Sequence, residues 1–564
     1  MKARVWIFMA VTGLCMVLCE LSYAEVLSDR VGMHIRERIE AATLTSDRIL
    51  CADETYCVSA LLEGFYTGRQ YRPCWVDNDG NLLTHGEEFI GVIREAHREG
   101  LRPEDYHLRE TEVLLSELKR GKGVGKRSDT ITLTDLDLTL TDALLLYTRH
   151  LLHGRVEHQN VYTEEVVTLR TLEMASSFYT ALMSGERGDT LADLISRPSG
   201  YEKLREKLED YMSVAGYGGW SQIPPGPTLK RGSQGQRVAQ LRDRLIVSGD
   251  LDTVAEHHPD VFGKALEEGV RRFQKRHGLK VDGKVAKETL DILNIPVETR
   301  IRQMALNMDR LRWLPDDLGK RHIFVNIADF RLEVVEDDRQ VMTMKIIVGK
   351  KDQPSCMLSG KMVYLELNPF WKIPDGIAIK EILPQIKKNP EYLAEKSIKL
   401  LRDWNDNAKE IDPKTVDWSR MRENNFRYRL RQEPGSLNPL GRVKFIFPNE
   451  CEIYLHDTPG RHLFGRQRRD FSHGCIRIEK PMDMAVYLLR DRQGWTRKKI
   501  LAEIGKGKRQ VVTLSGPFDV HITYLTAWVD RSGILQFRSD IYRIDQIPYE
   551  LPVKPVTAFT GIPQ

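Results

Sequence analysis

The 564-residue sequence has almost no excess of charge of either sign: 84 basic and 80 acidic residues leave a formal net charge of +4. It also lacks the large basic cluster that a nucleic-acid-binding surface normally requires. Basic runs are short, and Arg466-Gln467-Arg468-Arg469, for example, contains only three arginines. We therefore do not expect nucleic acid as a partner.

Long apolar runs are missing beyond the N-terminus, although a membrane-spanning helix needs about 20 apolar residues. The N-terminus itself has the pattern of a secretory signal peptide. Lys2 and Arg4 precede an apolar stretch at 5–18, and Ser22-Tyr23-Ala24 fits a cleavage site. We expect cleavage after residue 24 and a mature periplasmic protein without an integral membrane span. A retained signal anchor is the alternative. Export also argues against cytosolic cofactors such as ATP and NAD.

Cysteine is scarce. The chain has eight, and Cys15 and Cys19 fall within the expected leader. An oxidising compartment favours disulfides between the others. Cys51 and Cys57 are close enough in sequence to pair, but sequence alone cannot fix the connectivity. Any of the six remaining cysteines, Cys475 included, could therefore be half of a structural bridge.

Length and composition, with 41% hydrophobic and 29% charged residues, predict several folded domains. Helical periodicity dominates up to about residue 213, and Gly/Pro-rich segments follow at 216–219 and 224–227. From residue 323 onward the pattern changes to short runs rich in β-branched residues, which predict strands. The fold class that we expect is a multidomain α+β protein.

We expect six segments along the chain. They are a signal peptide, a helical scaffold, a small three-helix module, a helical return to the scaffold, a mostly β domain and a C-terminal tail. Their expected limits are 1–24, 25–227, 228–296, 297–320, 321–545 and 546–564. A charged, helical insertion at about 376–425 is expected to cover one end of the β domain.

Groups suited to acyl transfer are concentrated in two neighbouring segments, 453–459 and 471–477. The thiolate is the reactive form of cysteine and the usual thiol pKa is about 8.5, so Cys475 needs an imidazole to take its proton. Gly474 permits a tight turn, and the N–H groups of Gly474 and Cys475 are natural donors to a tetrahedral oxyanion. These residues alone leave open which histidine is the base.

Simpler explanations exist for the same residues. Cys475 could be half of a disulfide, and His456 could merely end a strand. His456, His462, His473 and Cys475 could also bind zinc, although His473 and Cys475 lie too close together for a usual zinc knuckle. We expect neither a metal nor an organic cofactor.

The spacing of these residues resembles a known signature. His456, fifteen intervening residues and Ser-His-Gly-Cys-Ile-Arg at 472–477 are similar to the motif of L,D-transpeptidases. Further segments resemble the long Gram-negative form of that family, with its helical scaffold and its peptidoglycan-binding module of three short helices. These segments are 65–66, 73–75, 100–106, 229–296, 368–374, 431–435 and 440–449.

The resemblance implies that Cys475 is the nucleophile and that His456 accepts and returns its proton. It implies that Asp457 orients His456, often through a backbone carbonyl. The remaining residues would shape the substrate and oxyanion site: Ser472, His473, Gly474 and Arg477.

The function implied is the formation of 3–3 cross-links in peptidoglycan through a cysteine thioester. The implied partners are the stem peptides and the glycan, with carbapenems as covalent inhibitors. The alternatives are an L,D-carboxypeptidase, an enzyme that attaches envelope proteins to the wall, and a non-catalytic wall-binding protein.

One segment departs from the family pattern. After Val348-Gly349-Lys350 the family usually has Thr-Pro, and Cys356 falls about where that proline is expected. A bridge from Cys356 to Cys451 is conceivable. We therefore expect the substrate entrance to differ from that of relatives, with no catalytic position lost.

Overall fold

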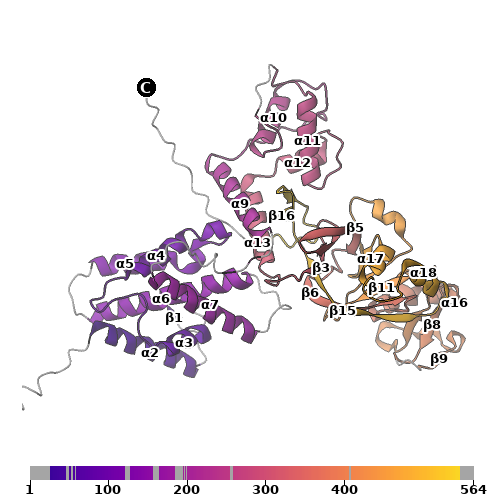
Figure 1. The fold of residues 1–564 in the computed structure, drawn as a ribbon, viewed down its shortest axis with the longest axis horizontal. Helices are drawn as coiled ribbons and strands as arrows, with labels where there is room; N and C mark the ends of the chain where they lie inside the picture. Colours follow the sequence, from indigo (N-terminus) through magenta and orange to yellow (C-terminus); the bar gives the residue numbers. More distant parts are fainter. Residues whose placement is uncertain are drawn as a thin grey trace, which may run out of the picture. The chain divides into compact units, whose positions relative to one another are not determined.

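The computed structural model describes residues 26–546, except 46–49, 52–54, 57–58, 121–126, 156–163, 185–194, 196, 198–199, 254–257 and 405–407. The expected signal peptide, the tail beyond residue 546 and the possible pairing of Cys51 with Cys57 lie outside the described residues and side chains. The chain divides between Arg197 and Pro198 into two compact units, and each is described by itself (Figure 1).

The first unit is helical. The long helix α6 contacts α2, α3, α5 and α7, and its core is built from aliphatic and aromatic side chains. The elements are α2 (Leu27–Thr45), α3 (Ser59–Gly68), α4 (Thr84–Arg94), α5 (Leu108–Arg120), α6 (Arg127–His153), α7 (Glu164–Ser184), the 3-10 turns η1 (Ala96–Glu99) and η2 (Pro103–Tyr106), and the short strands β1 (Leu50–Cys51) and β2 (Thr55–Tyr56).

Asp137 on α6 organises the centre of this helical unit. Its buried carboxylate accepts hydrogen bonds from the Cys74 and Trp75 backbone N–H groups at 2.9 and 2.8 Å, and from the Tyr66 hydroxyl at 2.7 Å. Burial raises the pKa of Asp137, and these donors offset part of that cost. The segments around Tyr66 and Cys74, prominent in the sequence, thus meet at one buried acid.

The second unit begins with two helices, α9 (Tyr201–Gly216) and α13 (Val297–Leu311), that lie side by side (Figure 1). Between them in sequence comes a module of three helices, α10 (Gln236–Val247), α11 (Lys264–Arg276) and α12 (Lys287–Leu293). The expected helix α13 is present, and it packs on α9 and contacts the hairpin strand β16 (Ala527–Val529).

The three-helix module has its own apolar core, with Leu241, Leu266 and Phe273 fully buried. Gln274 fixes the turn after α11 because its side-chain oxygen accepts from the N–H groups of Asp282 and Gly283 at 3.0 and 2.8 Å. The module is therefore a small folded body whose turns are held by side chains.

The β domain contains a nine-stranded sheet in the order β13-β5-β14-β12-β11-β6-β15-β3-β4, and an additional β4–β5 pairing makes it barrel-like. The strands are β3 (Arg321–Asn326), β4 (Arg331–Glu336), β5 (Arg339–Gly349), β6 (Leu358–Leu367), β11 (Val443–Ile446), β12 (Leu455–His456), β13 (Asp470–Ser472), β14 (Ile476–Ile478) and β15 (Gln510–Thr523). Helices α17 (Pro481–Leu488) and α18 (Arg497–Gly505) pack with this sheet. The expectation of a multidomain α+β fold is confirmed.

The insertion in the β domain has more strand than the sequence indicates. It contains a four-stranded sheet, β7-β10-β8-β9, with its own apolar core. Its elements are β7 (Trp371–Lys372), α14 (Asp375–Ile377), the π-helical turn η3 (Ala378–Ile382), α15 (Leu383–Lys388), α16 (Tyr392–Glu395), β8 (Ile398–Leu401), β9 (Glu410–Ile411), η4 (Pro413–Thr415), η5 (Trp418–Arg420), η6 (Glu423–Asn425) and β10 (Arg429–Gln432). Strands of two to four residues are too short to show alternation. We call residues 371–432 the cap.

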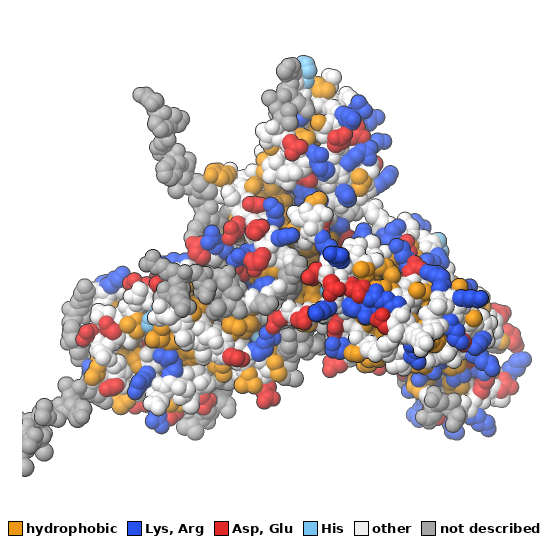
Figure 2. Space-filling view, viewed as in Figure 1, with side chains coloured by type: hydrophobic (Ala, Val, Ile, Leu, Met, Phe, Trp, Pro, Cys, Tyr) orange, Lys and Arg blue, Asp and Glu red, His pale blue; other side chains and the backbone are white. Residues whose placement is uncertain are grey.

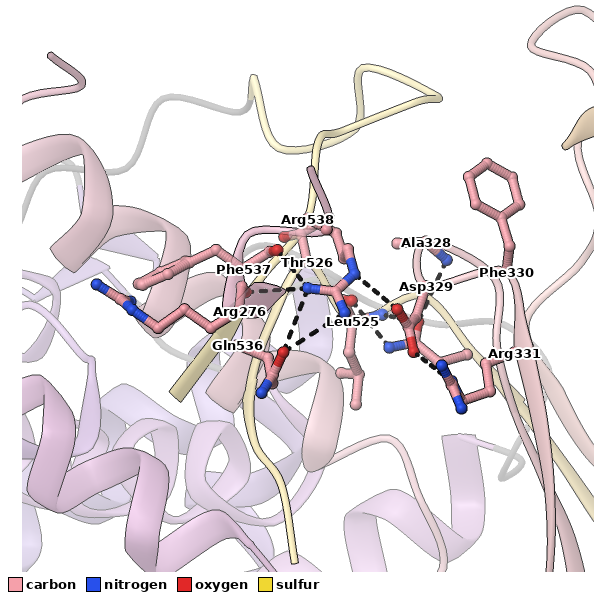
Figure 3. Close-up of polar contacts among 12 residues, drawn as sticks. Arg276, Ala328, Asp329, Phe330, Arg331, Leu525, Thr526, Gln536, Phe537 and Arg538 are labelled. Carbon is pink, nitrogen blue, oxygen red and sulfur yellow. Dashed lines mark hydrogen bonds and ion pairs between the residues drawn. The ribbon is translucent and has the colours of Figure 1, made fainter. Parts of the chain in front are cut away.

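The module contacts the β domain through the hairpin β16–β17, in which β17 is Leu535–Phe537 (Figure 3). The Arg538 guanidinium bonds to the Asp329 carboxylate at 2.6 Å and to the Arg276 backbone oxygen at 3.0 Å. The ring of Phe537 stacks on His277 with centroids 5.3 Å apart. These contacts join the end of α11 to the β domain.

The charged surface matches the balanced composition. On the face drawn in Figure 2, basic and acidic side chains are interspersed over the β domain. None of the helices in the described ranges is both long and apolar enough to cross a membrane.

Candidate active site

Strand pairing brings the two segments of the candidate site together. Strand β12 runs parallel to β14, with Leu455 opposite Ile476 and His456 opposite Arg477. The Ile476 N–H donates to the Tyr454 carbonyl at 3.1 Å. Cys475 immediately precedes Ile476, so its thiol lies beside the strand that carries His456.

The turn before Cys475 is held from two directions. Gly474 has a φ of +115°, which disfavours any side chain there. The Ser472 hydroxyl donates to the Cys475 carbonyl at 2.6 Å and accepts from the Gly474 N–H at 3.2 Å. The Ser355 hydroxyl donates to the Gly474 carbonyl at 2.6 Å. The Gly474 N–H, expected as an oxyanion donor, is therefore engaged by Ser472 in this state.

Cys475 is a free, partly exposed cysteine, so the disulfide explanation for this residue is wrong. Burial raises the pKa of the Cys475 thiol. Hydrogen bonds from the Tyr454 backbone and side chain, and the positive charges of Lys444 and Arg477, act in the opposite direction. The resting thiol is thus protonated at neutral pH but is surrounded by groups that stabilise its anion.

His456 is 4% exposed and has a defined orientation. Its Nδ1 lies 2.6 Å from the Asp457 carbonyl oxygen, so Nδ1 carries the proton and Nε2 is left as the acceptor. Burial, followed by the charge of Arg477, lowers the pKa of His456 to about 3. The imidazole is therefore neutral across the physiological range.

Asp457 bonds to His456 through its backbone and to the residue just before β11 through its side chain. The Asp457 carboxylate accepts from the Arg442 N–H at 2.9 Å. A Cβ at Gly441 would clash with that carboxylate, and the φ of +62° at this position also favours glycine. The resemblance implies that Asp457 orients His456 through a backbone carbonyl, and the Asp457 carbonyl oxygen lies 2.6 Å from His456 Nδ1.

We call residues 472–475 the thiol turn. The side chain of His473 points from this turn toward the cap. Its Nε2 lies 2.6 Å from the Glu381 carboxylate on η3, and both side chains are partly exposed. Arg477 is half-buried, and burial lowers its pKa. Among the described residues its Nε has no hydrogen-bond partner.

In the described ranges, no three His, Cys, Asp or Glu side chains are grouped so that they could hold a metal ion. His456 and His473 make separate contacts, one to a backbone oxygen and one to Glu381.

Comparison with protein families accounts for most of the chain. Residues 320–500 match the family described as "L,D-transpeptidase catalytic domain". The chain carries an L,D-transpeptidase catalytic domain. Residues 234–293 match "Putative peptidoglycan binding domain", and residues 60–208 match "Scaffold domain". The resemblance noted in the sequence is confirmed.

A curated relative also carries the transpeptidase name. The "Putative L,D-transpeptidase" of Haemophilus influenzae is 33% identical over 250 residues. That match covers 44% of this chain and 49% of the relative, so the chain spans about half the length of the curated relative that it matches.

Solved structures give weaker likenesses. An L,D-transpeptidase from Xylanimonas cellulosilytica is 16% identical with a TM-score of 0.17, covering 53% of this chain and 99% of that chain. The Ldtfm–avibactam carbamoyl enzyme is 12% identical with a TM-score of 0.15, covering 57% and 98%. TM-scores this low are no evidence of a shared arrangement. The family matches alone imply an extracytoplasmic location, because both domains are related to peptidoglycan.

The transpeptidase domain contains one disulfide in its described part, from Cys356 to Cys451, with Cα atoms 6.5 Å apart. The bridge considered from the sequence is therefore confirmed. Cys356 follows Ser355, which bonds to Gly474, and Cys451 lies three residues before Tyr454. The bridge thus joins the two segments that flank the thiol turn.

Sequence reasoning missed two residues close to Cys475. The Tyr454 side chain is hydrogen-bonded to the Cys475 thiol, and the Lys444 ammonium lies 3.7 Å from the centroid of the Tyr454 ring. Tyr454 lies just before β12, two residues from His456, and the centroids of the two rings are 5.7 Å apart. Residues two apart in an extended segment share a face, so the sequence contained a signal for Tyr454. Lys444 is far from Cys475 in sequence, and only the pairing of β11 with β12 shows that it lies opposite His456.

Proposed function

We propose that this protein is a periplasmic L,D-transpeptidase that forms 3–3 cross-links in peptidoglycan through a thioester on Cys475. The observation that carries most weight is the β12–β14 pairing, because it sets a free thiol beside a strand with a buried, oriented imidazole. Cys475 is the nucleophile in this proposal, and His456 moves the proton.

The first half-reaction removes the terminal D-alanine of a tetrapeptide stem. The Cys475 sulfur attacks the carbonyl carbon at the L-centre of the third residue, and the bond to the D-alanine nitrogen breaks. The thiol proton passes to His456 Nε2 and then to the leaving amine. A thioester remains on the enzyme.

The second half-reaction transfers the acyl group. A side-chain amine of a diaminopimelate on another stem attacks the thioester carbon, His456 takes the amine proton, and the C–S bond breaks. The proton then returns to the sulfur. The thioester conserves the energy of the original amide, so the exchange calls for neither ATP nor a metal ion.

The pKa shifts of His456 and Cys475 support a resting enzyme in which the imidazole and the thiol are both uncharged. His456 has a pKa of about 3 and burial raises the pKa of Cys475, so neither is ionised at pH 7. Proton transfer then accompanies attack, since the forming thiolate raises the proton affinity of the adjacent imidazole. The Cys475 N–H and the Tyr454 hydroxyl are the donors that we propose for the oxyanion and the thiolate.

The other residues have supporting roles in this proposal. Ser472 fixes the turn, Asp457 orients His456 through its carbonyl, and Arg477 supplies positive charge beside the site. Gly474 allows the turn to form. His473 joins that turn to the cap, which we propose covers the substrate groove. The three-helix module is proposed to bind glycan or stem peptide, and residues 1–24 to direct export.

The direct test is incubation of the purified protein with disaccharide-tetrapeptide, followed by mass analysis of the products. A dimer that has lost one D-alanine is the expected product. A trimmed tripeptide alone would identify an L,D-carboxypeptidase, and linkage to an added protein amine would identify an anchoring enzyme.

A carbapenem provides a second test that separates an enzyme from a non-catalytic wall-binding protein. We expect one covalent adduct per chain on the wild-type protein and on Cys74→Ser, which lacks the other described free cysteine. We expect no adduct on Cys475→Ala. A wild-type protein without an adduct, or an adduct on Cys475→Ala, would contradict the proposal.

A further inference from the structure

Four titratable side chains form a row across the sheet that contains the candidate site. Lys444 on β11 lies opposite Glu366 on β6 and opposite His456 on β12, and His456 lies opposite Arg477 on β14. Side chains at directly opposed positions share one face of a sheet. Lys444 is therefore the cation between the buried acid and the buried imidazole.

Lys444 is also close to the thiol. Its ammonium lies 3.7 Å from the centroid of the Tyr454 ring, an arrangement in which a cation is attracted to the ring face. The same tyrosine is hydrogen-bonded to the Cys475 thiol. A contact path thus runs from the ammonium through the phenol to the sulfur.

Several charged groups face Lys444 from the surrounding elements. Glu366 on β6 is paired with Arg509 at 2.5 Å, so its negative charge is already partly neutralised. Burial lowers the pKa of Lys444, while Glu366 and Cys475 raise it and Arg509 and Lys372 lower it. Burying an ammonium in this way is costly unless an anion forms nearby.

We propose that Lys444 is a positioning residue that stabilises the Cys475 thiolate, acting through Tyr454. This inference relies on the proposed function only in taking Cys475 as the nucleophile. A positive charge held over the phenol ring makes its hydroxyl a stronger donor to the anionic sulfur. The same charge disfavours a second cation on His456, so proton transfer from Cys475 waits for substrate attack.

The test measures the pH dependence of Cys475 alkylation by iodoacetamide, quantified on the peptide that contains Cys475. Peptide analysis separates this signal from Cys74, whose thiol pKa is raised strongly by burial. Lys444→Met should move the alkylation midpoint upward by about one pH unit, so alkylation below the midpoint becomes about tenfold slower. Glu366→Gln should move the midpoint downward, because it removes the only negative charge in the row.

Lys361→Met is the matched control. Lys361 is an exposed lysine of the same strand as Glu366, and it pairs with Asp519 on the neighbouring strand. Its midpoint should equal that of the wild type. Thermal melting of each variant identifies any loss of folding.

Opposite shifts for Lys444→Met and Glu366→Gln support the inference, because loss of packing alone would not move the midpoint in both directions. An unchanged or lower midpoint in folded Lys444→Met overturns it. Alkylation requires no peptidoglycan. Opposite shifts without any cross-linked product would therefore contradict only the proposed function, and an unmoved midpoint with normal cross-linking would contradict only the role of Lys444.

Discussion

Burial lowers the pKa of His456, and the ring also lies between two positive side chains, Lys444 on β11 and Arg477 on β14, that lower it further. Because the folded protein keeps this imidazole neutral, its free energy of unfolding decreases in acid. The unfolded chain takes up a proton near the usual histidine pKa of about 6.5, whereas the folded site resists protonation down to a pKa of about 3. Stability contributed by the neutral ring is therefore present above pH 6.5 and is lost as the pH falls.

This linkage gives a measurable prediction. Between pH 7 and pH 5, His456 should lower the free energy of unfolding by about 2 kcal/mol, at about 1.4 kcal/mol per pH unit below 6.5. His456→Gln should lose that part of the acid sensitivity, while His462→Gln, which changes an exposed histidine, should keep it. Urea unfolding at both pH values provides the measurement. Equal pH dependence in the wild type and His456→Gln would contradict the charge assignment.

The sequence allowed us to predict the reacting residues but not the charged side chains that surround them in the fold. The spacing of His456 and the Ser-His-Gly-Cys-Ile-Arg segment carried the assignment of Cys475 and His456. The contribution of Lys444 depends on which strand lies beside β12, and no local pattern near residue 444 contains that information. Tyr454, two residues before His456, could have been found from strand alternation.

At the scale of elements, the Cys356–Cys451 bridge anchors a segment that contacts the turn before Cys475. It closes a sequence separation of 95 residues and lies next to Ser355, whose hydroxyl holds the Gly474 carbonyl. Ser355 also accepts from the Gly349 N–H at 3.0 Å, so it ties the end of β5 to the thiol turn. The turn therefore depends on a segment that the disulfide anchors.

Removing this bridge should cost both stability and activity. Cys356→Ser/Cys451→Ser should lower the free energy of unfolding by about 2–4 kcal/mol, as is typical for a bridge that closes a long loop. It should also slow acylation of Cys475, because Ser355 becomes less well held. Denaturant unfolding with and without dithiothreitol measures the first effect. A wild-type curve that does not respond to reduction would contradict the prediction.

The elements that sequence captured best are the long ones. The strands expected from residue 323 onward begin with β3, β4 and β5, and the helices expected at 228–296 are α10, α11 and α12. The four-stranded sheet of the cap escaped prediction because its strands are only two to four residues long and because β10 pairs with β7 and β8 across more than 25 positions. Tertiary pairing, rather than local preference, forms those strands.

At the scale of the whole molecule, the described part of the second unit joins a peptidoglycan-binding module to the transpeptidase domain. Gln467, four residues before the segment 471–477 that contains Cys475, donates to the Gly278 carbonyl at 3.1 Å. Phe537 stacks on His277, and burial lowers the pKa of His277 so that this ring is neutral in the stack. The docking thus combines an apolar stack with hydrogen bonds.

Loss of the stack should loosen the module without unfolding it. In Phe537→Ala we expect faster backbone hydrogen exchange at the C-terminal end of α11, around residues 273–279, with the interior of α10 unchanged. Lys264→Ala, at an exposed position on the same helix, is the control. Hydrogen-exchange mass spectrometry gives the comparison, and an exchange pattern identical to that of the wild type would contradict the docking role of Phe537.

Sequence indicated that a module and a transpeptidase domain follow one another, but not how they touch. The contact residues Arg276, Phe537 and Arg538 come from segments more than 250 positions apart, and each looks like an ordinary core or surface residue in sequence. Such contacts follow from the folded positions of α11 and the β16–β17 hairpin.

The measurement that tests the central claim most directly is capture of the acyl-enzyme. The protein is mixed with disaccharide-tetrapeptide, quenched in acid at short times and digested for peptide mass analysis. We expect the peptide that contains Cys475 to gain the mass of the donor minus D-alanine, and hydroxylamine to remove that mass. Cross-linked product formed without this adduct, or formed by Cys475→Ala, would contradict the thioester mechanism.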